Sequence, residues 1–282
     1  MWTQARGAKR HRLTPPPPRA TQGPTPCRAG ARCGLNAEHA DHMIPMSKIA
    51  AHEGPVSGAM VDPHARGLFD ADIALALCDP RAPLGGLLSP ERAGMGRMVD
   101  KRQREFTAGR VAAHRAMAEL GYPAQPVLPG ADRAPIWPDG LMGSLSHCDS
   151  LCICAMGRSR DVQSLGVDVE EDAPLDAELF DAILTPPERN WLDNQPADEM
   201  GRLARLLFSA KETAYKAQYP LSRTVLDFES ISIELVLETG RYDAIFMHSV
   251  GPFATGTRLS GRFVRAQGLI LTGITLRRRP GG

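Results

Sequence analysis

The sequence predicts an α+β fold made of two related halves. Stretches with a helical spacing of apolar residues come first, strand-like alternation follows, and this order occurs twice along the chain. Glycine-rich joints between the later strands indicate antiparallel pairing. We therefore expect two pseudo-symmetric halves, residues 66–165 and residues 166–282, each a small antiparallel sheet packed with helices.

The first half is expected to begin with one long helix. Ser89 can cap this helix with Pro90 at its first position, and Gly121 can end it. Between these points Phe106, Arg110, Ala113, Met117 and Leu120 recur at spacings of three and four, which is helical periodicity. Fraying is expected only where Gly94 and Gly96 occur.

The second half is expected to contain two helices. Thr185 and Glu188 have the spacing of a capping box, which predicts a helix that begins at Thr185. A further helix is expected from about Arg202 to Ala217, because Pro220 follows it. Across both halves, strands are predicted at residues 151–156, 165–170, 231–237, 241–246, 257–265 and 269–276.

The composition is that of an ordinary globular protein. Of 282 residues, 43% are hydrophobic and 23% are charged, and the formal net charge is +1. No stretch reaches the ~18 apolar residues that a membrane span needs, and so small a net charge creates no general attraction for nucleic acid. We therefore expect a cytoplasmic protein without stable membrane insertion and without a nucleic-acid partner.

Residues 1–65 are expected to form a disordered N-terminal extension. The first 42 of them are rich in proline and arginine and poor in bulky apolar residues, so burial cannot offset the entropy of ordering them. They also lack the apolar segment of a secretory signal. The alternative is a start codon placed too early, with Met43, Met46 or Met60 as the true start.

The six cysteines favour reduced thiols. Cys148, Cys152 and Cys154 lie close together, but no second ligand pair follows at zinc-finger spacing. Because no secretion signal is present either, we expect small buried thiols rather than disulfides or a zinc site.

The run Gly166-Val167-Asp168-Val169-Glu170 carries the strongest chemical signal. In a strand, Asp168 and Glu170 point to one face while the valines point into the core. Two adjacent carboxylates repel each other, and Mg²⁺ is the natural ion to lie between them. The alternative is an exposed strand face that carries acids without a metal.

Glu212 and Lys216 form a second signal. They are four positions apart on a predicted helix, in the order that favours an ion pair. A solvated salt bridge is one interpretation of this spacing. The other is that Glu212 supplies a third carboxylate to the metal while Lys216 stabilises charge on a transferring phosphate.

Two basic clusters could bind an anion. Ser146 and His147 lie in a run of small and hydroxyl-bearing residues that suits a phosphate cradle, and Arg133 could add a fixed positive charge. Arg102 and Arg110 are about 80° apart around their helix, so both could contact one polyanion. The alternatives are a structural histidine and solvated surface arginines.

In this order along residues 92–276, the motifs resemble the 4′-phosphopantetheinyl transferase superfamily, in particular the branch that contains enterobactin synthetase component D. The motifs are Lys101-Arg102-x-x-Glu105-Phe106-x-x-x-Arg110, Arg133-x-Pro135-x-Trp137-Pro138, Gly143-Ser144-Leu145-Ser146-His147, Gly166-Val167-Asp168-Val169-Glu170 and Phe208-Ser209-Ala210-Lys211-Glu212-x-x-Tyr215-Lys216.

The resemblance implies a monomer with coenzyme A in a cleft between the two halves. It implies that a serine hydroxyl of an apo acyl or peptidyl carrier protein attacks the β-phosphorus of coenzyme A and releases adenosine 3′,5′-bisphosphate. The carrier protein would serve siderophore, polyketide, nonribosomal peptide or fatty acid synthesis. By the same resemblance, Mg²⁺ (or Mn²⁺) is held by Asp168, Glu170 and Glu212, and phosphate is contacted by Lys216 and Lys211. The nucleotide end is held by Arg102, Arg110, Arg133 and His147, and Ser146 is a further residue that binds coenzyme A.

The catalytic residues implied are Glu212, Lys216 and Asp168, with Glu212 or a water as the general base. Two other classes of protein remain open at this point. A Mg²⁺-dependent phosphatase or nuclease would also use the Asp168 and Glu170 pair, and an inactive coenzyme A-binding module would keep the basic residues.

Overall fold

The computed structural model describes residues 63–96 and 98–278. The expected extension at residues 1–65 lies outside the described residues except for its last three, as do the alternative start methionines and the first two cysteines. No helix in the described ranges is both long and apolar enough to cross a membrane. Cys78, Cys148, Cys152 and Cys154 are free and buried, so the prediction of reduced buried thiols is confirmed for them.

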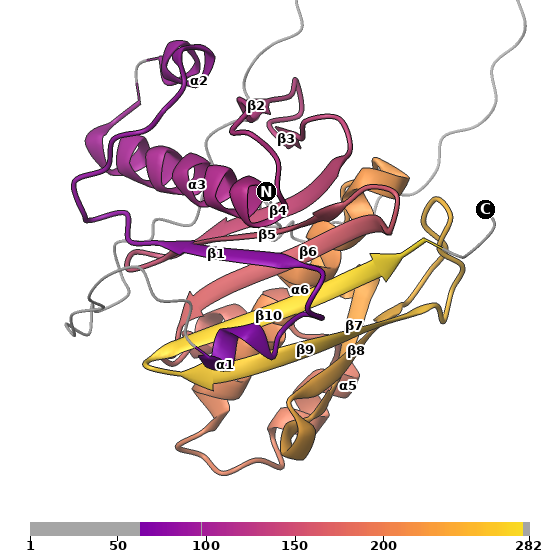
Figure 1. Ribbon diagram of the computed structural model, residues 1–282. Helices are drawn as coiled ribbons and strands as arrows, with labels where there is room; N and C mark the ends of the chain where they lie inside the picture. Colours follow the sequence, from indigo (N-terminus) through magenta and orange to yellow (C-terminus); the bar gives the residue numbers. More distant parts are fainter. Residues whose placement is uncertain (1–62, 97, 279–282) are drawn as a thin grey trace, which may run out of the picture. The chain divides into compact units, whose positions relative to one another are not determined.

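The first half has the element order strand, two helices, four strands (Figure 1). A short helix α1 (Pro63–Arg66) precedes it. Its elements are β1 (Ala74–Cys78), α2 (Ser89–Gly94), α3 (Asp100–Glu119), β2 (Leu128–Pro129), β3 (Pro135–Ile136), β4 (Leu141–His147) and β5 (Cys152–Arg158).

The second half repeats this order with short additions. Its main elements are β6 (Val162–Glu171), α5 (Pro186–Leu192), α6 (Met200–Ser222), β7 (Ile231–Val236), β8 (Arg241–Phe246), β9 (Arg258–Ala266) and β10 (Leu269–Arg277). The additions are the 3-10 helices η2 (Ala177–Leu179), η3 (Phe228–Ser230) and η4 (Leu237–Thr239) and the helix α4 (Phe180–Ile183).

The sheets share one topology. The first sheet has the strand order β1-β5-β4, and the second has β6-β10-β9-β8-β7, with every pairing antiparallel. The first three strands correspond one to one, and the short β2–β3 hairpin takes the place of β7 and β8. The predicted α+β fold with two pseudo-symmetric halves is therefore confirmed.

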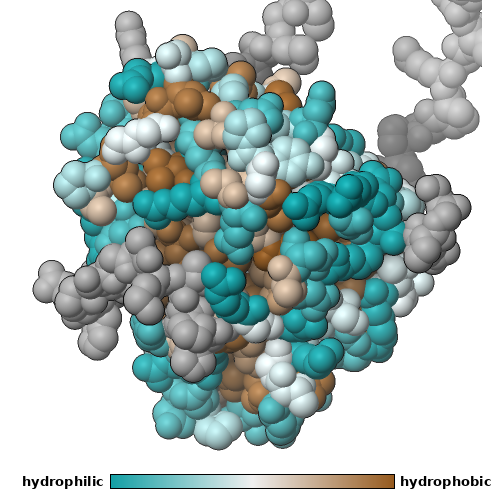
Figure 2. Space-filling view, viewed as in Figure 1, coloured by the Kyte–Doolittle hydropathy of each residue, from teal (hydrophilic) through white to brown (hydrophobic). Residues whose placement is uncertain are grey.

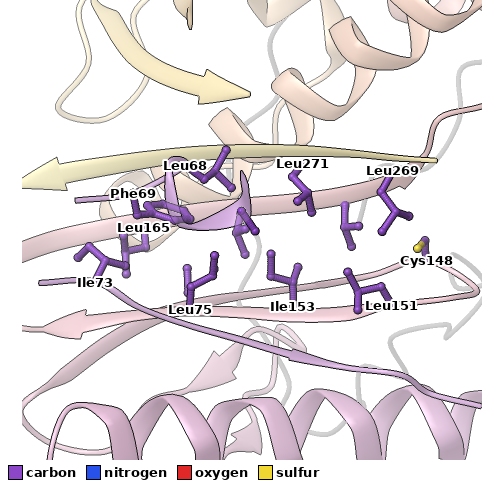
Figure 3. Close-up of a cluster of buried hydrophobic side chains, with 14 of the residues drawn as sticks. Leu68, Phe69, Ile73, Leu75, Cys148, Leu151, Ile153, Leu165, Leu269 and Leu271 are labelled. Atoms are coloured by element: carbon purple, nitrogen blue, oxygen red, sulfur yellow. The ribbon is translucent and has the colours of Figure 1, made fainter. Parts of the chain in front are cut away.

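The two sheets face each other across an apolar core. Figure 3 shows Leu75 and Ile153 of the first sheet pointing toward Leu165 and Leu271 of the second, and all four side chains are buried. Helix α3 covers the other face of the first sheet, and α6 packs on β6 and β10 of the second. The layers are helix, sheet, sheet, helix.

Strand β5 shows why a nearly unbroken apolar run was needed. Ile153 and Ala155 lie in the core between the sheets, whereas Cys152, Cys154 and Met156 lie in the core under α3. A strand that is buried on both faces needs apolar residues at every position. The polar residues that could serve a site must therefore come from other strands.

The structure corrects the predicted helix boundaries. The first helix is two helices, because α2 ends at Gly94 and α3 begins only at Asp100. The last long helix does not stop at Ala217: α6 runs through Pro220 to Ser222 and ends where Arg223 adopts a left-handed φ of 54°. Pro220 cannot donate a backbone hydrogen bond, but only Leu221 and Ser222 follow it in α6. The missing bond therefore lies at the end of the helix, where it disrupts little.

Two further expectations are refined. The segment that was expected to cradle phosphate is the strand β4, paired with β5 from Leu141 to His147. The predicted boundary between the halves falls inside β6, so the chain passes from one half to the other at the β5–β6 turn.

The face shown in Figure 2 mixes hydrophilic and hydrophobic side chains. The large hydrophobic side chains that are exposed in the described ranges come from separate places along the chain: Val99, Ile136, Val225, Val236, Leu237 and Met247.

A candidate active site between β4, β6 and α6

Strand β6 orients the two predicted acids as its period of two requires. Val167 and Val169 are fully buried between the sheets, so Asp168 and Glu170 point to the opposite face, toward α6. Gly166 lets the helix approach this face, because a Cβ there would meet the backbone oxygen of Thr213 at 2.1 Å. The glycine of the motif is therefore a packing requirement of the site.

Asp168 joins three elements. Its Oδ1 accepts hydrogen bonds from Lys216 Nζ on α6 at 2.6 Å and from Ser146 Oγ on β4 at 2.7 Å. Lys216 also donates to Ser146 Oγ at 2.9 Å. Three predicted site residues, Ser146, Asp168 and Lys216, are thus in direct contact although they lie far apart in the sequence.

Lys216 pairs with Asp168 across the helix–sheet interface, and not along the helix with Glu212 as the spacing suggested. Burial alone would lower the pKa of Lys216, but the charges of Asp168 and Glu212 outweigh it and hold the pKa above its ordinary value. The ammonium group is therefore a permanent positive charge at neutral pH.

Glu170 and Glu212 are the other two carboxyl groups of the predicted metal site. Burial, followed by repulsion from Asp168, raises the pKa of Glu170 to about 8, although Arg205 opposes this by donating to Glu170 Oε2 at 3.0 Å. Burial also raises the pKa of Glu212, Lys216 lowers it and Asp168 raises it again. A cation between these carboxylates would relieve both the burial cost and the repulsion.

This donor set fits Mg²⁺. No group of three His, Cys, Asp or Glu side chains within residues 63–96 and 98–278 is arranged to hold a metal ion by itself. Mg²⁺ does not need such a cage, since it usually takes one or two carboxylates and completes its shell with phosphate oxygens and water. The neighbouring Asp168 and Glu170 satisfy that requirement.

Arg102 and His147 form a basic pair beside this cluster. Arg102 Nη1 lies 3.0 Å from His147 Nε2, and both side chains approach Glu105. Because a guanidinium group can only donate, we assign Nε2 as the acceptor and place the proton on Nδ1. Burial, with help from Arg102 and Lys216, lowers the pKa of His147 and keeps it neutral, although Glu105 opposes the shift.

Arg110 is held more rigidly than a surface arginine. Its Nε donates to the backbone oxygen of Val127 at 2.7 Å, and its guanidinium lies 4.2 Å from the centre of the Phe106 ring. Burial lowers its pKa. Arg133 lies in the β2–β3 turn with a left-handed φ of 63°.

The position of Lys211 argues against its predicted contact with phosphate. Its side chain is 1% exposed and forms an ion pair with Glu188 at 2.8 Å, and it also donates to the backbone oxygen of Phe228. Lys211 and Lys216 are five positions apart, which separates them by about 140° around the helix. Lys211 therefore holds α6 against its own half and does not join the cluster.

Some residues of the site escaped the sequence interpretation. Ser209 donates to Asp168 Oδ2 at 2.8 Å, and Arg205 and Glu105 contact predicted residues as described above. A signal for Ser209 was available, because it precedes Lys216 by two helical turns and so shares its face. A surface cavity of about 280 Å³ at the start of α3, lined partly by Asp100 and Arg104, contains none of the predicted residues.

Carboxyl groups and basic groups thus meet at the junction of β4, β6 and α6, an arrangement that suits the binding of a phosphate group and a cation. Comparisons with known proteins identify the family. The 4′-phosphopantetheinyl transferase N-terminal domain matches residues 90–157, and the 4′-phosphopantetheinyl transferase superfamily domain matches residues 164–251.

Curated relatives support the same family. The chain is 38% identical to 4′-phosphopantetheinyl transferase Svp of Streptomyces mobaraensis over 201 residues, which cover 70% of this chain and 81% of the relative. It is 37% identical to 4′-phosphopantetheinyl transferase PptT of Mycobacterium tuberculosis over 66% of this chain and 85% of the relative. Enterobactin synthase component D of Escherichia coli K12 is 36% identical over 51% of this chain and 68% of the relative.

The chain belongs to the 4′-phosphopantetheinyl transferase superfamily. It is a 4′-phosphopantetheinyl transferase, and the family implies coenzyme A and a carrier protein as its two substrates.

Proposed function

We propose that this enzyme transfers the 4′-phosphopantetheine group of coenzyme A to a serine of an apo acyl or peptidyl carrier protein in the presence of Mg²⁺ or Mn²⁺, and releases adenosine 3′,5′-bisphosphate. The observation that supports this most directly is the contact between Lys216, Asp168 and Ser146, which come from α6, β6 and β4. It places a fixed ammonium beside a carboxylate pair. That is the charge arrangement needed by a metal-bound pyrophosphate.

The reaction makes one phosphorus–oxygen bond and breaks another. The serine oxygen of the carrier protein bonds to the β-phosphorus, and the bond from this phosphorus to the bridging pyrophosphate oxygen breaks. The electron pair of that bond leaves with adenosine 3′,5′-bisphosphate. The serine proton passes to Glu212 or to a water that Glu212 orients.

The protein supplies positioning and fixed charge. Lys216 stabilises negative charge on the transferring phosphate, and Ser146 keeps Lys216 and Asp168 in place. Asp168, Glu170 and Glu212 would hold the metal ion. When bound, Mg²⁺ neutralises charge on the pyrophosphate and so favours departure of the nucleotide.

The nucleotide end of coenzyme A is assigned to the basic groups of the first half. Arg102 and His147 are already paired, and His147 Nδ1 is buried without a hydrogen-bond partner among the described residues, so it can donate to a ligand oxygen. Arg110 and Arg133 complete the predicted set. The monomeric state and the cleft between the halves remain predictions.

The test is mass spectrometry of apo carrier proteins incubated with coenzyme A, Mg²⁺ and the enzyme. We expect the mass of one phosphopantetheine to be added to a single serine, and no addition when EDTA is present. Asp168→Ala should abolish the addition while circular dichroism shows a folded protein. A folded Asp168→Ala variant that modifies the carrier at the wild-type rate would refute the metal assignment.

The same assay separates the alternatives. A phosphatase or nuclease would release phosphate or nucleotides without modifying the carrier, and a binding module would do neither.

A further inference from the structure

Behind Asp168 lies a chain of three buried hydroxyl groups. Ser209 Oγ contacts Asp168 Oδ2 at 2.8 Å and Thr272 Oγ1 at 2.9 Å, and Thr272 Oγ1 contacts Thr213 Oγ1 at 2.6 Å. All three side chains are fully buried. Thr272 lies on β10 directly opposite Asp168 in the strand register, whereas the other two come from α6.

Counting protons fixes the direction of the hydrogen bond that reaches Asp168. Each hydroxyl has one proton to donate, and a carboxylate can only accept. Ser209 donates its proton to Asp168, so Thr272 is the only one of the two that can donate across their contact, and its hydroxyl also has the backbone oxygen of Ser209 as an acceptor at 3.1 Å. Thr213 Oγ1 contacts Thr272 Oγ1 and also has the backbone oxygen of Thr272 as an acceptor at 3.4 Å, so the contacts run without a break from Thr213 through Thr272 and Ser209 to the carboxylate.

The two oxygens of Asp168 therefore have different environments. Oδ2 is tied inward to Ser209, in a region closed to solvent. Oδ1 faces Lys216 and Ser146, which are on the side of the predicted phosphate and metal site. Rotation of the carboxylate would break the bond to Ser209 and leave a buried group without its partner, which is costly.

We propose that Ser209 is a positioning residue that fixes the orientation of Asp168 so that Oδ1 is presented to the metal ion, and that Thr272 and Thr213 hold Ser209 in place. This proposal rests on the proposed function, because it assumes that Asp168 is a metal ligand. Partners that orient a metal-binding carboxylate in this way strongly influence metal affinity. Ser209 itself touches neither substrate nor metal.

The first measurement is Mn²⁺ binding, followed by electron paramagnetic resonance, with the full chain and coenzyme A but no carrier protein. Without the acceptor no turnover occurs, so the readout is independent of activity. We expect Ser209→Ala to weaken Mn²⁺ binding about 10-fold. In the transfer assay the same variant should raise the apparent KM for Mg²⁺ by a similar factor, while kcat at saturating Mg²⁺ stays within about two-fold of wild type.

Ser164 supplies a matched control. It is also a fully buried serine that bridges β6 and α6, since its Oγ donates to the backbone oxygen of Ala217 at 2.6 Å, but it does not contact Asp168. Ser164→Ala removes one buried hydroxyl from the same interface. It should therefore lower stability as Ser209→Ala does and leave Mn²⁺ binding unchanged.

Thr272 tests the rest of the chain. Thr272→Val keeps the shape but removes the hydroxyl, and should weaken Mn²⁺ binding in the same direction as Ser209→Ala but by less. Thr272→Ser restores the hydroxyl and should bind Mn²⁺ as wild type does. This pair also decides the question if Ser209→Ala does not fold.

The outcomes separate this proposal from the proposed function. Wild-type Mn²⁺ binding by Ser209→Ala, with binding lost in Asp168→Ala, overturns the role of Ser209 and leaves the metal assignment intact. Equal losses in Ser209→Ala and Ser164→Ala overturn it as well, because the effect would then be general to the interface. Wild-type binding by Asp168→Ala overturns both proposals.

Discussion

The two halves share a buried glutamate that connects each short helix to its long helix. Glu91 in α2 accepts from the backbone N–H of Leu88 and contacts His114 Nε2 on α3 at 3.0 Å. Glu188 in α5 accepts from the backbone N–H of Thr185 and pairs with Lys211 Nζ on α6 at 2.8 Å. Both glutamates are almost completely buried.

Each glutamate also binds a third segment. Glu91 accepts from the N–H of Val127, just before β2, and Glu188 accepts from the N–H of Ile233 in β7. In both halves the basic partner follows the glutamate by 23 positions. The glutamates are therefore equivalent parts of one repeated framework.

The halves differ in the residues that follow the basic partner on each long helix. Counting from Lys211, the site residues Glu212 and Lys216 correspond to Arg115 and Glu119 in α3, which are exposed. The predicted metal ligand and ammonium group of the helix are thus found on α6 alone, whereas the predicted residues of the first half are Arg102, which lies near the start of α3, and Ser146 and His147, which lie on β4. The buried glutamates that stabilise the halves are therefore distinct from the residues predicted to act in the reaction. Substitutions at equivalent positions of the two halves test whether stability and activity depend on different residues.

The largest difference is expected between Lys216→Ala and Glu119→Ala. Loss of the ammonium beside Asp168 should lower kcat for phosphopantetheine transfer by roughly 100-fold or more, because a charge that stabilises the transferring phosphate is removed. Within the part of the chain that the structure describes, Glu119 makes only an exposed ion pair with Arg66 at 3.8 Å, so its loss should leave kcat unchanged. A comparable loss in Glu119→Ala would show that both helices serve the reaction.

The next difference concerns stability. Glu188→Gln leaves the charge of Lys211 buried without a counterion, and should lower the free energy of unfolding by about 3–5 kcal/mol. Glu91→Gln leaves His114, which can be neutral, and should cost only about 1–3 kcal/mol. Urea unfolding of the three proteins measures this.

A double variant checks the physical reason. Adding Lys211→Met to Glu188→Gln removes the unpaired charge and should recover part of the lost stability. If the double variant is less stable than Glu188→Gln, the cost does not come from a buried charge.

The third difference is in substrate binding, where the first half should matter. Arg102→Ala should raise the KM for coenzyme A roughly 10- to 150-fold, because a charge-assisted bond is worth about 1.5–3 kcal/mol, with a smaller change in the KM for the carrier protein. Lys101→Ala is the matched control, since Lys101 is the neighbouring basic residue and pairs with Asp149. It should change neither constant.

Dephospho-coenzyme A, which lacks the 3′-phosphate, sharpens this test. If Arg102 holds that phosphate, the variant and the wild type should use the truncated donor equally well. A wild-type KM for both donors in Arg102→Ala would show that the arginine is only surface.

The carboxylate pair could be predicted because strand geometry alone determines it. A period of two sends Asp168 and Glu170 to one face whatever the fold around them. The spacing of Lys211 and Lys216 also separates them around the helix, although the resemblance implied that both contact phosphate. The partner of Lys211 was not predictable, since Glu188 lies in another helix and only the packing of α5 on α6 brings the two together.

The break between α2 and α3 and the extension of α6 show a second limit. Gly94 and Gly96 marked the place of the break, but the sequence predicted only fraying there and not the end of one helix and the start of another. Pro220 suggested an end that the packing of α6 overrides. The contact between Asp168 and Ser146 joins two sheets, and no local pattern encodes it.

The smallest expected difference between the halves is in the rate at which buried cysteines are alkylated, which measures opening of the first half alone. All cysteines of the described residues lie in that half, and the sequence has none after Cys154. Burial raises the pKa of Cys148 to about 12 and raises those of Cys78, Cys152 and Cys154 as well. At pH 8 these thiols are protonated and enclosed, so iodoacetamide should modify them only when the first half opens.

The same shifts give a pH dependence. Between the ordinary thiol pKa of 9.0 and the raised values, the folded chain holds more protons than the unfolded chain, so stability falls as pH rises above 9. Cys154→Ala should therefore lose less of its melting temperature between pH 8 and pH 10 than wild type does. An equal loss would show that the thiol does not contribute to this dependence.

Alkylation at pH 8 then compares the two glutamates directly. Glu91→Gln weakens the framework around the cysteines and should speed their modification, by a few-fold for each kcal/mol lost if the halves open separately. Glu188→Gln costs more stability, yet it should leave the rate near that of wild type, because the half it loosens contains no cysteine. Peptide mass spectrometry at Cys154 follows the rate. Equal acceleration by both variants would mean that the apolar core between the sheets makes the halves open as one unit.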